Sequence, residues 1–186
     1  MSSQPRREHL LNIAYRLFNQ HGYHATGIDL ILAESGVSKA TLYKYFSCKE
    51  ALILEVLQRR HTQLEQHFKQ ALQEAKNTKY PALCLFDVLT NWFNEKEFFG
   101  CNFIKASGEF PDRKSEIHRY AAWHKESVKQ LIADSFKSFG KRKQVQLADA
   151  IVLLMDGAIV TAQVKADKSA AQTSKKIAEA MINGSL

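Results

Sequence analysis

The segment Ser35-Gly-Val-Ser-Lys-Ala-Thr-Leu-Tyr-Lys-Tyr-Phe46 contains a helix that is too short to be stable alone. From Ser38 onward it spans barely two turns, and isolated helices of that length are marginal in water. Neighbouring segments must therefore hold it. Gly36 supplies a tight turn before it, and Val37 fills the corner. What the outer face of this helix is for decides how the whole sequence is interpreted.

The apolar residues of the short helix predict its orientation. Leu42 and Phe46 lie one turn apart, so we expect both to face the core. At about 100° per residue, the outer face then carries one small residue, hydroxyl groups and ammonium groups. Its members are Ala40 and Lys44 in the middle, Thr41 and Tyr43 beside them, and Lys39 at the edge.

Two interpretations of this face stay open on charge and spacing alone. Ammonium and hydroxyl groups meet phosphate oxygens and base edges. Two helices joined by a short glycine turn, the second with such a face, form a helix-turn-helix that lays its second helix in the major groove. The alternative is a solvated helix corner with ordinary surface lysines.

The rest of the chain predicts an all-α protein. It has 186 residues, 45% of them hydrophobic, with only 3 prolines and without runs of alternating β-branched residues. Thr26 is expected to be the N-cap of the second helix, with Asp29 three residues on. The predicted helices are 6–21, 27–35, 38–45, 48–77, 82–95, 102–108, 114–139, 144–165 and 170–182.

Composition limits the partners and the compartment. The net charge of +7 favours an anionic partner. The 3 cysteines lack metal-site spacing, which predicts free thiols in a reducing cytoplasm, with no metal and no cofactor. We expect no signal peptide and no membrane span, because the longest apolar stretch, 150–164, is short and interrupted by Asp156.

The N-terminal region resembles the DNA-binding domain of the TetR family of transcriptional regulators. The resemblance runs from Leu10 to Leu54 and rests on Gly22-Tyr-His-Ala-Thr26 and the following "IDLILAESGVSKATLYKYFSCKEAL". It implies a three-helix helix-turn-helix domain over residues 1–47 and a larger helical domain for ligand binding and dimerisation over 48–186. Gly100-Cys101 and Leu154-Met-Asp-Gly-Ala158 are similar to features of some TetR-like regulatory domains.

The resemblance also implies roles for single residues. Thr26 and Tyr43 would bind phosphates, helped by Lys39 and by Lys49 at the start of the fourth helix. Bases would meet Ala40, Thr41 and Lys44, and the DNA-binding set also includes Ser38. Gly27 and Asp29 depart from the family pattern. For Arg6 and Arg7, backbone contact and plain surface charge both stay open.

The resemblance further implies a homodimer that reads a near-palindromic operator through a four-helix bundle. A second copy multiplies the affinity of so small a reading head. Small and aliphatic residues at helical spacing are the candidates for the interface, although they could equally cover only their own core. They are Leu147, Ile151, Leu154, Ala158, Thr161, Ala178, Met181 and Ile182.

Family regulators keep a pocket for a small effector, and aromatic walls suit an apolar or planar ligand. The candidates are Phe86, Leu89, Trp92, Phe93, Phe103, Trp123 and Asp156. Asp156 stands in an apolar run, so it either contacts the ligand or bonds a neighbouring helix or water. Cys101 is read as a buried inert thiol or as a redox switch.

The sequence therefore predicts a ligand-responsive DNA-binding regulator, with repression as the family's usual mode, in which an effector shifts the two reading heads and releases DNA. A helical enzyme using Cys101 and a histidine is the first alternative. No arrangement of nucleophile, base and orienting group is readable for it, so we expect no enzyme. The second alternative is a basic scaffold that binds nucleic acid without sequence choice.

Overall fold

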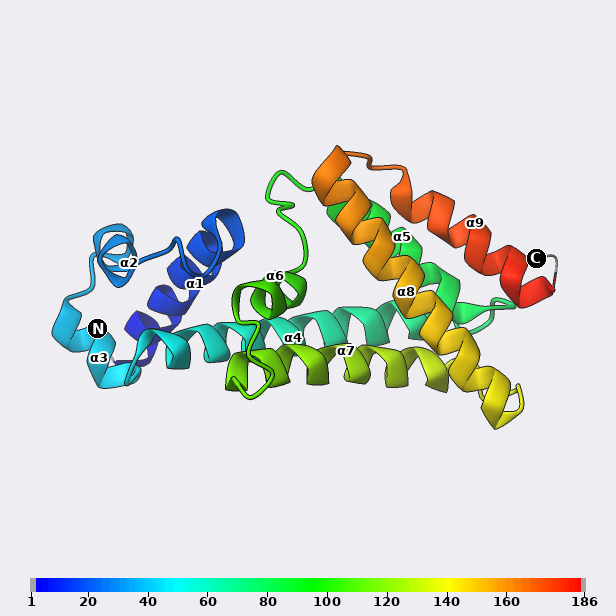
Figure 1. The fold of residues 1–186 in the computed structure, drawn as a ribbon, viewed down its shortest axis with the longest axis horizontal. Coiled ribbons are helices and arrows are strands. Elements are labelled where there is room, and N and C mark those ends of the chain that lie inside the picture. The colour runs from blue at the N-terminus through cyan, green and yellow to red at the C-terminus, as the bar shows by residue number, and fades with distance from the viewer. Residues whose placement is uncertain (1–2, 185–186) are drawn as a thin grey trace. The chain divides into compact units, whose positions relative to one another are not determined.

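The computed structural model describes residues 3–184, and only the backbone of Ser3 and Gln4. Within these residues the chain forms nine α-helices and one short 3-10 helix, with no β-strand (Figure 1). The predicted all-α class is confirmed.

The chain divides into two compact units. Unit 1 holds the chain up to Thr62 together with Cys101–Trp123, and unit 2 holds Gln63–Gly100 together with the chain from His124 onward. Two helices, α4 (Lys49–Glu74) and α7 (Glu116–Asp134), continue from one unit into the other. The functional boundary after residue 47 stays a prediction.

Unit 1 is built on α1 (Ser3–His21), α2 (Ile28–Ser35), α3 (Lys39–Tyr45), α6 (Asn102–Glu109) and the first halves of α4 and α7. Apolar residues three and four apart on α1 form one buried stripe that packs against the following helices. The buried set includes Leu10, Ala14, Leu17, Phe18, Tyr23, Ile31, Leu42, Phe46, Leu52, Ile53, Val56 and Leu57.

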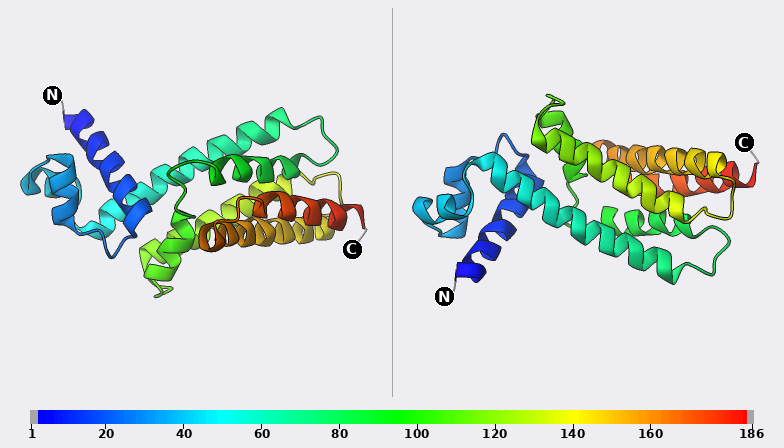
Figure 2. Two further views of the ribbon diagram at one scale, coloured as in Figure 1. Left: turned by 90° about the horizontal axis from the view of Figure 1, so that it is seen from above. Right: turned by 90° about the horizontal axis from the view of Figure 1, so that it is seen from below.

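Unit 2 is built on α5 (Cys84–Phe93), α8 (Lys141–Lys165) and α9 (Ala170–Asn183), with the second halves of α4 and α7. Pro81 opens a 3-10 helix, Pro81–Leu83, that leads into α5. Helix α9 packs against both α5 and α8, and Figure 2 shows α8 and α9 side by side. Asp87 on α5 ties α9 down, because its carboxylate accepts hydrogen bonds from Lys175 and Gln172.

Helix ends differ from the predictions where tight turns continue the chain. The predicted helix 114–139 stops at Asp134, because Phe136 and Phe139 then donate to carbonyls only three residues back. Gly140 is the N-cap of α8, so that helix begins at Lys141 rather than 144.

Helix α8 is long and apolar enough, by length and mean hydropathy, to cross a bilayer. One of its faces is buried against its neighbours in unit 2, as in the core helix of a soluble protein. Length and hydropathy alone are therefore weak grounds for a membrane span.

Candidate nucleic-acid interface

Helix α3 is held in the way that a seven-residue helix requires. Ser38 is its N-cap, and the Ser38 Oγ accepts a hydrogen bond of 3.2 Å from the backbone N–H of Thr41. Leu42 is fully buried and Phe46 nearly so, which anchors the inner side of α3 in the core of unit 1. The sequence predicted this orientation correctly.

The outer side of α3 is open to solvent. Lys39, Ala40, Tyr43 and Lys44 are exposed, and the side chain of Tyr43 keeps 44% of its accessible surface. Thr41 is half-buried. The predicted base-contacting and phosphate-contacting side chains thus share one accessible face, while the contact with DNA itself stays a prediction.

The turn before α3 requires a glycine. Gly36 adopts φ +64°, in the left-handed region, and its backbone N–H donates to the Leu32 carbonyl at 2.9 Å. From α1, the His9 Nε2 donates to the carbonyl of Ser35 at 3.1 Å. This bond fixes the end of α2 to the N-terminal part of α1.

The structure gives Thr26 a different role from the predicted one. Gly27, not Thr26, is the N-cap of α2. Thr26 is fully buried, and its hydroxyl lies 2.7 Å from the Gly22 carbonyl and 3.2 Å from the Leu17 carbonyl. It satisfies acceptors left at the end of α1. Its hydroxyl is therefore not presented to a phosphate, and we withdraw Thr26 from the set of contacting side chains.

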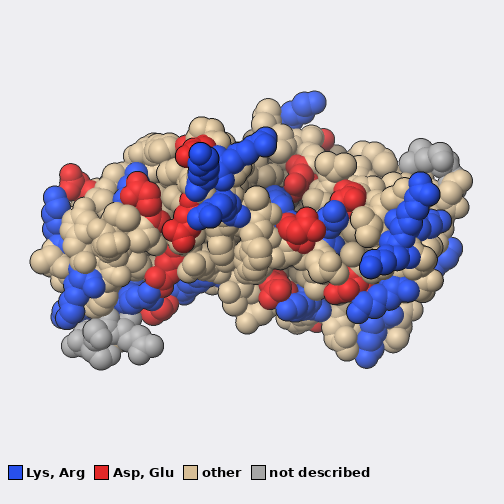
Figure 3. All heavy atoms as spheres, turned by 60° about the horizontal axis from the view of Figure 1, so that its bottom comes forward, with Lys and Arg blue, Asp and Glu red and all other residues tan. Residues whose placement is uncertain are grey.

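The cations around α3 differ from those elsewhere on the first helix. On α1, Arg7 pairs with Glu55, and Arg16 pairs with Glu34 at 2.6 Å. Arg6, Lys39 and Lys44 have no ion pair within residues 3–184. Uncompensated positive charge is what a phosphate-binding surface needs. Elsewhere, Figure 3 shows cationic and anionic side chains interspersed on one face of the molecule.

Lys49 opens α4 and lies beside the loop between α1 and α2. Its Nζ donates to the His24 carbonyl at 3.4 Å, and its side chain is half-buried. This long, weak bond leaves the ammonium group two further protons for an anion. The phosphate contact predicted for Lys49 stays a prediction.

Helix α6 holds the loop that follows α1. The carboxylate of Glu109 accepts hydrogen bonds from the backbone N–H groups of Tyr23, at 2.9 Å, and His24, at 2.6 Å. The imidazole Nε2 of His24 donates in return to the carbonyl of Glu109 at 2.7 Å. Two consecutive N–H groups that converge on one carboxylate form an anion nest.

Two further side chains of α6 reach α1 and the loop. The Lys105 Nζ donates to the carbonyl of Asn19 at 2.6 Å, and the Tyr23 hydroxyl donates to the carbonyl of Asn102 at 3.1 Å. Burial lowers the pKa of Lys105, and burial raises the pKa of Tyr23 well above its ordinary value. Both directions fit side chains enclosed between α1 and α6.

The residues predicted for an effector pocket are spread over both units. Phe86, Leu89, Trp92, Phe93 and Asp156 belong to unit 2, whereas Phe103 and Trp123 belong to unit 1. Phe86, Leu89, Phe93 and Phe103 are buried, whereas Trp123 is 49% exposed and packs against His61. In unit 2 the ring of Phe98 lies 5.0 Å from Trp92 and 4.9 Å from Phe93. Their binding of an effector stays a prediction.

Asp156 follows the second of its two sequence interpretations. Its carboxylate pairs with the Nζ of Lys125 on α7 at 2.5 Å, and both side chains are about two-thirds buried. The bond to a neighbouring helix accounts for a carboxylate in an apolar run without invoking a ligand.

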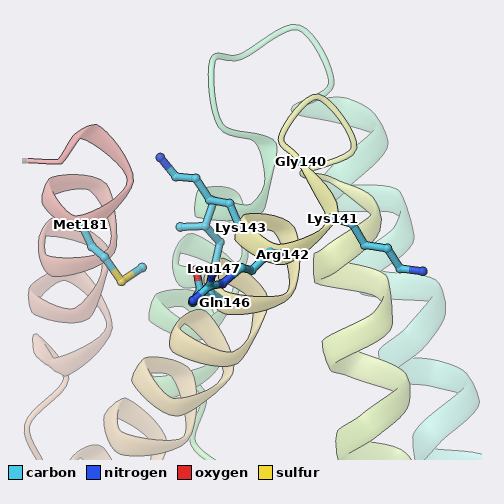
Figure 4. A pocket seen from close by; sticks show the side chains of 7 residues that line it. All are labelled: Gly140, Lys141, Arg142, Lys143, Gln146, Leu147 and Met181. Atoms are coloured by element: carbon cyan, nitrogen blue, oxygen red, sulfur yellow. The ribbon is translucent and has the colours of Figure 1, made fainter.

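The structure turns most of the predicted dimer residues inward. Leu147, Ile151, Ala158, Ala178 and Ile182 are buried in unit 2, whereas Leu154, Thr161 and Met181 are half-buried at the margins. Leu147 and Met181 line a hollow of about 560 Å³ at the start of α8, rimmed by Lys141, Arg142 and Lys143 (Figure 4). These five buried side chains cover their own core.

The opposite face of α8 is apolar and exposed. Leu153, Gly157, Val160 and Val164 follow each other at spacings of three and four, so they form one stripe. Leu153 and Val164 keep 73% and 76% of their accessible surface. Ile177 on α9 is also exposed. Sequence reasoning missed this stripe, because α8 is apolar on both faces.

The cysteines differ in their access to solvent. Cys48 is exposed, Cys84 is half-buried and Cys101 is buried. Burial, followed by the nearby Asp87 carboxylate, raises the pKa of Cys84 to about 11. The burial of Cys101, the N-cap of α6, favours the inert thiol of the two interpretations.

With the geometry in place, comparison with known proteins is informative. A family model described as "Bacterial regulatory proteins, tetR family" matches residues 10–56, which hold α2, α3 and parts of α1 and α4. The transcriptional activator FasR of Mycolicibacterium smegmatis is 43% identical over 74 residues, which are 40% of this chain and 34% of FasR. The transcriptional repressor NemR of Escherichia coli is 29% identical over 113 residues, which are 60% of this chain and 57% of NemR.

The similarity of structure extends over the whole chain. SCO4454, a TetR-family transcriptional regulator from Streptomyces coelicolor, superimposes with a TM-score of 0.85 and 26% sequence identity. The match covers 97% of this chain and 96% of SCO4454. By sequence, the chain spans about a third of FasR and somewhat over half of NemR.

Proposed function

Because the chain belongs to the TetR family of DNA-binding transcriptional regulators, we propose that it is a ligand-responsive repressor that binds a near-palindromic operator as a homodimer. The observation that carries the proposal is the outer face of α3. Four exposed side chains, two of them unpaired lysines, stand on a helix whose inner face is locked by Leu42 and Phe46.

The roles within this face follow from chemistry and position. Ala40, Thr41 and Lys44 would meet the base edges, because they lie at the centre of the exposed side. Tyr43 and Lys39 would bind backbone phosphates, with Lys49 and the cap residue Ser38 at the edge. Binding to DNA places the protein in the cytoplasm.

A second copy would cover the exposed stripe of α8. Regulators of this family act as dimers with small-molecule effectors. Leu153, Val160 and Val164, with Ile177 of α9, offer apolar surface that costs free energy when left in water. A two-fold axis through this stripe gives each protomer's face to the other and presents two copies of α3 to the two half-sites.

A small apolar or aromatic effector would release the DNA. The support is the cluster of Trp92, Phe93 and Phe98 rings in unit 2. Such a ligand acts only if it binds the DNA-free arrangement more tightly than the DNA-bound one. Repression is the direction that we propose, and both signs occur among the similar proteins, since NemR is a repressor and FasR an activator.

Selection of bound duplexes from a random pool tests the proposal. The expected result is one enriched near-palindrome whose half-sites lie about one helical turn, or a multiple of it, apart. Transcription in vitro from a promoter that overlaps the enriched site should then fall when the protein is added, and recover with a ligand that releases DNA. A pool that binds without enrichment would favour the scaffold interpretation instead.

A further inference from the structure

A hollow of about 610 Å³ lies between the N-terminal part of α1 and the turn that leads into α3. We call it the α1–α3 hollow. Its volume is in the range of clefts that take small molecules. Pro5, Arg6 and His9 line it from α1, and Ser35, Gly36, Val37, Ser38 and Thr41 line it from the turn and α3.

The lining of the α1–α3 hollow is cationic and rich in donors. Arg6 and His9 are its titratable residues, and no carboxylate is among the residues that line it. The nearest acidic residues along these helices are already engaged, because Glu8 pairs with Arg59 and Glu34 pairs with Arg16. An anion that enters the hollow therefore meets positive charge without a competing negative group.

Two hydroxyls lie at the side of the hollow that belongs to α3. The Ser38 and Thr41 hydroxyl oxygens are 2.9 Å apart, and each has a rotatable proton. The imidazole of His9 is held by its bond to the Ser35 carbonyl, which keeps the wall formed by α1 against the turn. A guanidinium and two hydroxyls around one space are groups that bind a phosphate.

We propose that the α1–α3 hollow binds a phosphate of the DNA backbone, with Arg6 as its cation and the Thr41 and Ser38 hydroxyls as its donors. This inference rests on the proposed function. DNA is favoured over a free anion because Ser38 and Thr41 also belong to the helix whose exposed face we assign to the major groove. A duplex that meets this face brings a phosphate strand to the mouth of the hollow.

The salt dependence of binding to the selected duplex tests this proposal. Each phosphate contact contributes roughly 0.9 to the slope of log K against log salt concentration. Arg6→Ala should reduce that slope by about 0.9 per half-site. Arg16→Ala is the matched control, because it removes the same charge from the same helix but from a residue paired with Glu34. The control should leave the slope near that of the unaltered protein.

The hydroxyl is tested without a change of charge. Thr41→Val keeps the shape of the side chain and should weaken binding roughly five- to tenfold. Binding to the selected duplex and to duplexes with single base changes should weaken by similar factors, because a phosphate contact carries no sequence information. Circular dichroism establishes that each variant is folded, and Arg6→Gln replaces Arg6→Ala if the alanine variant is not.

Three outcomes separate the possibilities. If Arg6→Ala and Arg16→Ala give the same slope while the unaltered protein selects a site, the hollow proposal fails and the proposed function stands. If the unaltered protein selects no site, the proposed function itself fails. If inorganic phosphate alone raises the melting temperature through Arg6 while the DNA slope is unchanged in Arg6→Ala, the hollow is a free-anion site, and the proposal is overturned.

Discussion

The carboxylate of Glu109, at the end of α6, lies 2.9 Å from the backbone nitrogen of Tyr23, just after α1. The two residues are 86 positions apart in the chain. Through this bond and its neighbour at His24, α6 fixes the loop that leads from α1 to α2, and therefore the start of the helix-turn-helix. Charge-assisted bonds of this kind are about twice as strong as neutral ones.

Replacing Glu109 should loosen this loop. Glu109→Ala leaves two backbone N–H groups without their acceptor, so we expect the free energy of unfolding to fall by about 2 kcal/mol. Amide hydrogen exchange at Tyr23 and His24 should accelerate. Glu126→Ala, which removes an exposed carboxylate from α7, is the control and should change stability by less than about 0.5 kcal/mol. Unchanged exchange at both amides would contradict the assigned role of Glu109.

Gly22 precedes the nest and cannot readily be replaced. It adopts φ +89°, and an added Cβ would lie 2.9 Å from the Oε1 of Glu109. Gly22→Ala should therefore cost about 1–2 kcal/mol in urea unfolding. Gly108→Ala is the matched control within α6, where a Cβ meets nothing within 4 Å, and it should stabilise by up to about 1 kcal/mol. Equal effects of the two substitutions would refute the steric argument.

Two neighbouring residues of α3 should affect DNA binding in different ways. Tyr43→Ala removes a phosphate contact, so it should weaken binding to every duplex by a similar factor. Lys44→Ala removes a base contact and should cost about 1–3 kcal/mol at one base pair, which relaxes the preference there. Fluorescence anisotropy with a panel of single-base variants of the selected site measures both. A uniform loss for both variants would show that Lys44 does not read a base.

The exposed stripe of α8 should hold the dimer together. Leu153→Glu places a charge at the centre of the proposed interface, so we expect dissociation into monomers and a much weaker affinity for the full operator. Leu30→Glu, at an exposed leucine of α2, is the control for oligomeric state. Analytical ultracentrifugation measures the change. A Leu153→Glu protein that remains a dimer would exclude this stripe as the interface.

The sequence predicted the local features of α3 because they depend on local rules. The spacing of Leu42 and Phe46 determines which side is buried, and Ser38 caps the first turn from three residues away. Thr26 was misassigned because its environment is not local. Carbonyls at the end of α1 draw its hydroxyl into the core, and Gly27 takes its place at the start of α2.

Other features could not be predicted from the sequence, for two physical reasons. Both faces of α8 are apolar, so periodicity alone did not show that Ile151 points inward and Leu153 outward. The bond between Glu109 and Tyr23 joins distant segments, and no local pattern signals it. The α1–α3 hollow likewise depends on how Arg6 and His9 meet the turn after α2.

Affinity cleavage from α3 tests the central claim most directly. An Ala40→Cys variant that also carries Cys48→Ser, so that the exposed native thiol is absent, would be loaded with iron–EDTA on the new thiol and bound to the selected duplex. The account predicts two symmetric clusters of cuts, one in the major groove of each half-site. Cutting that is absent, or spread evenly along the duplex while the protein stays bound, would contradict it.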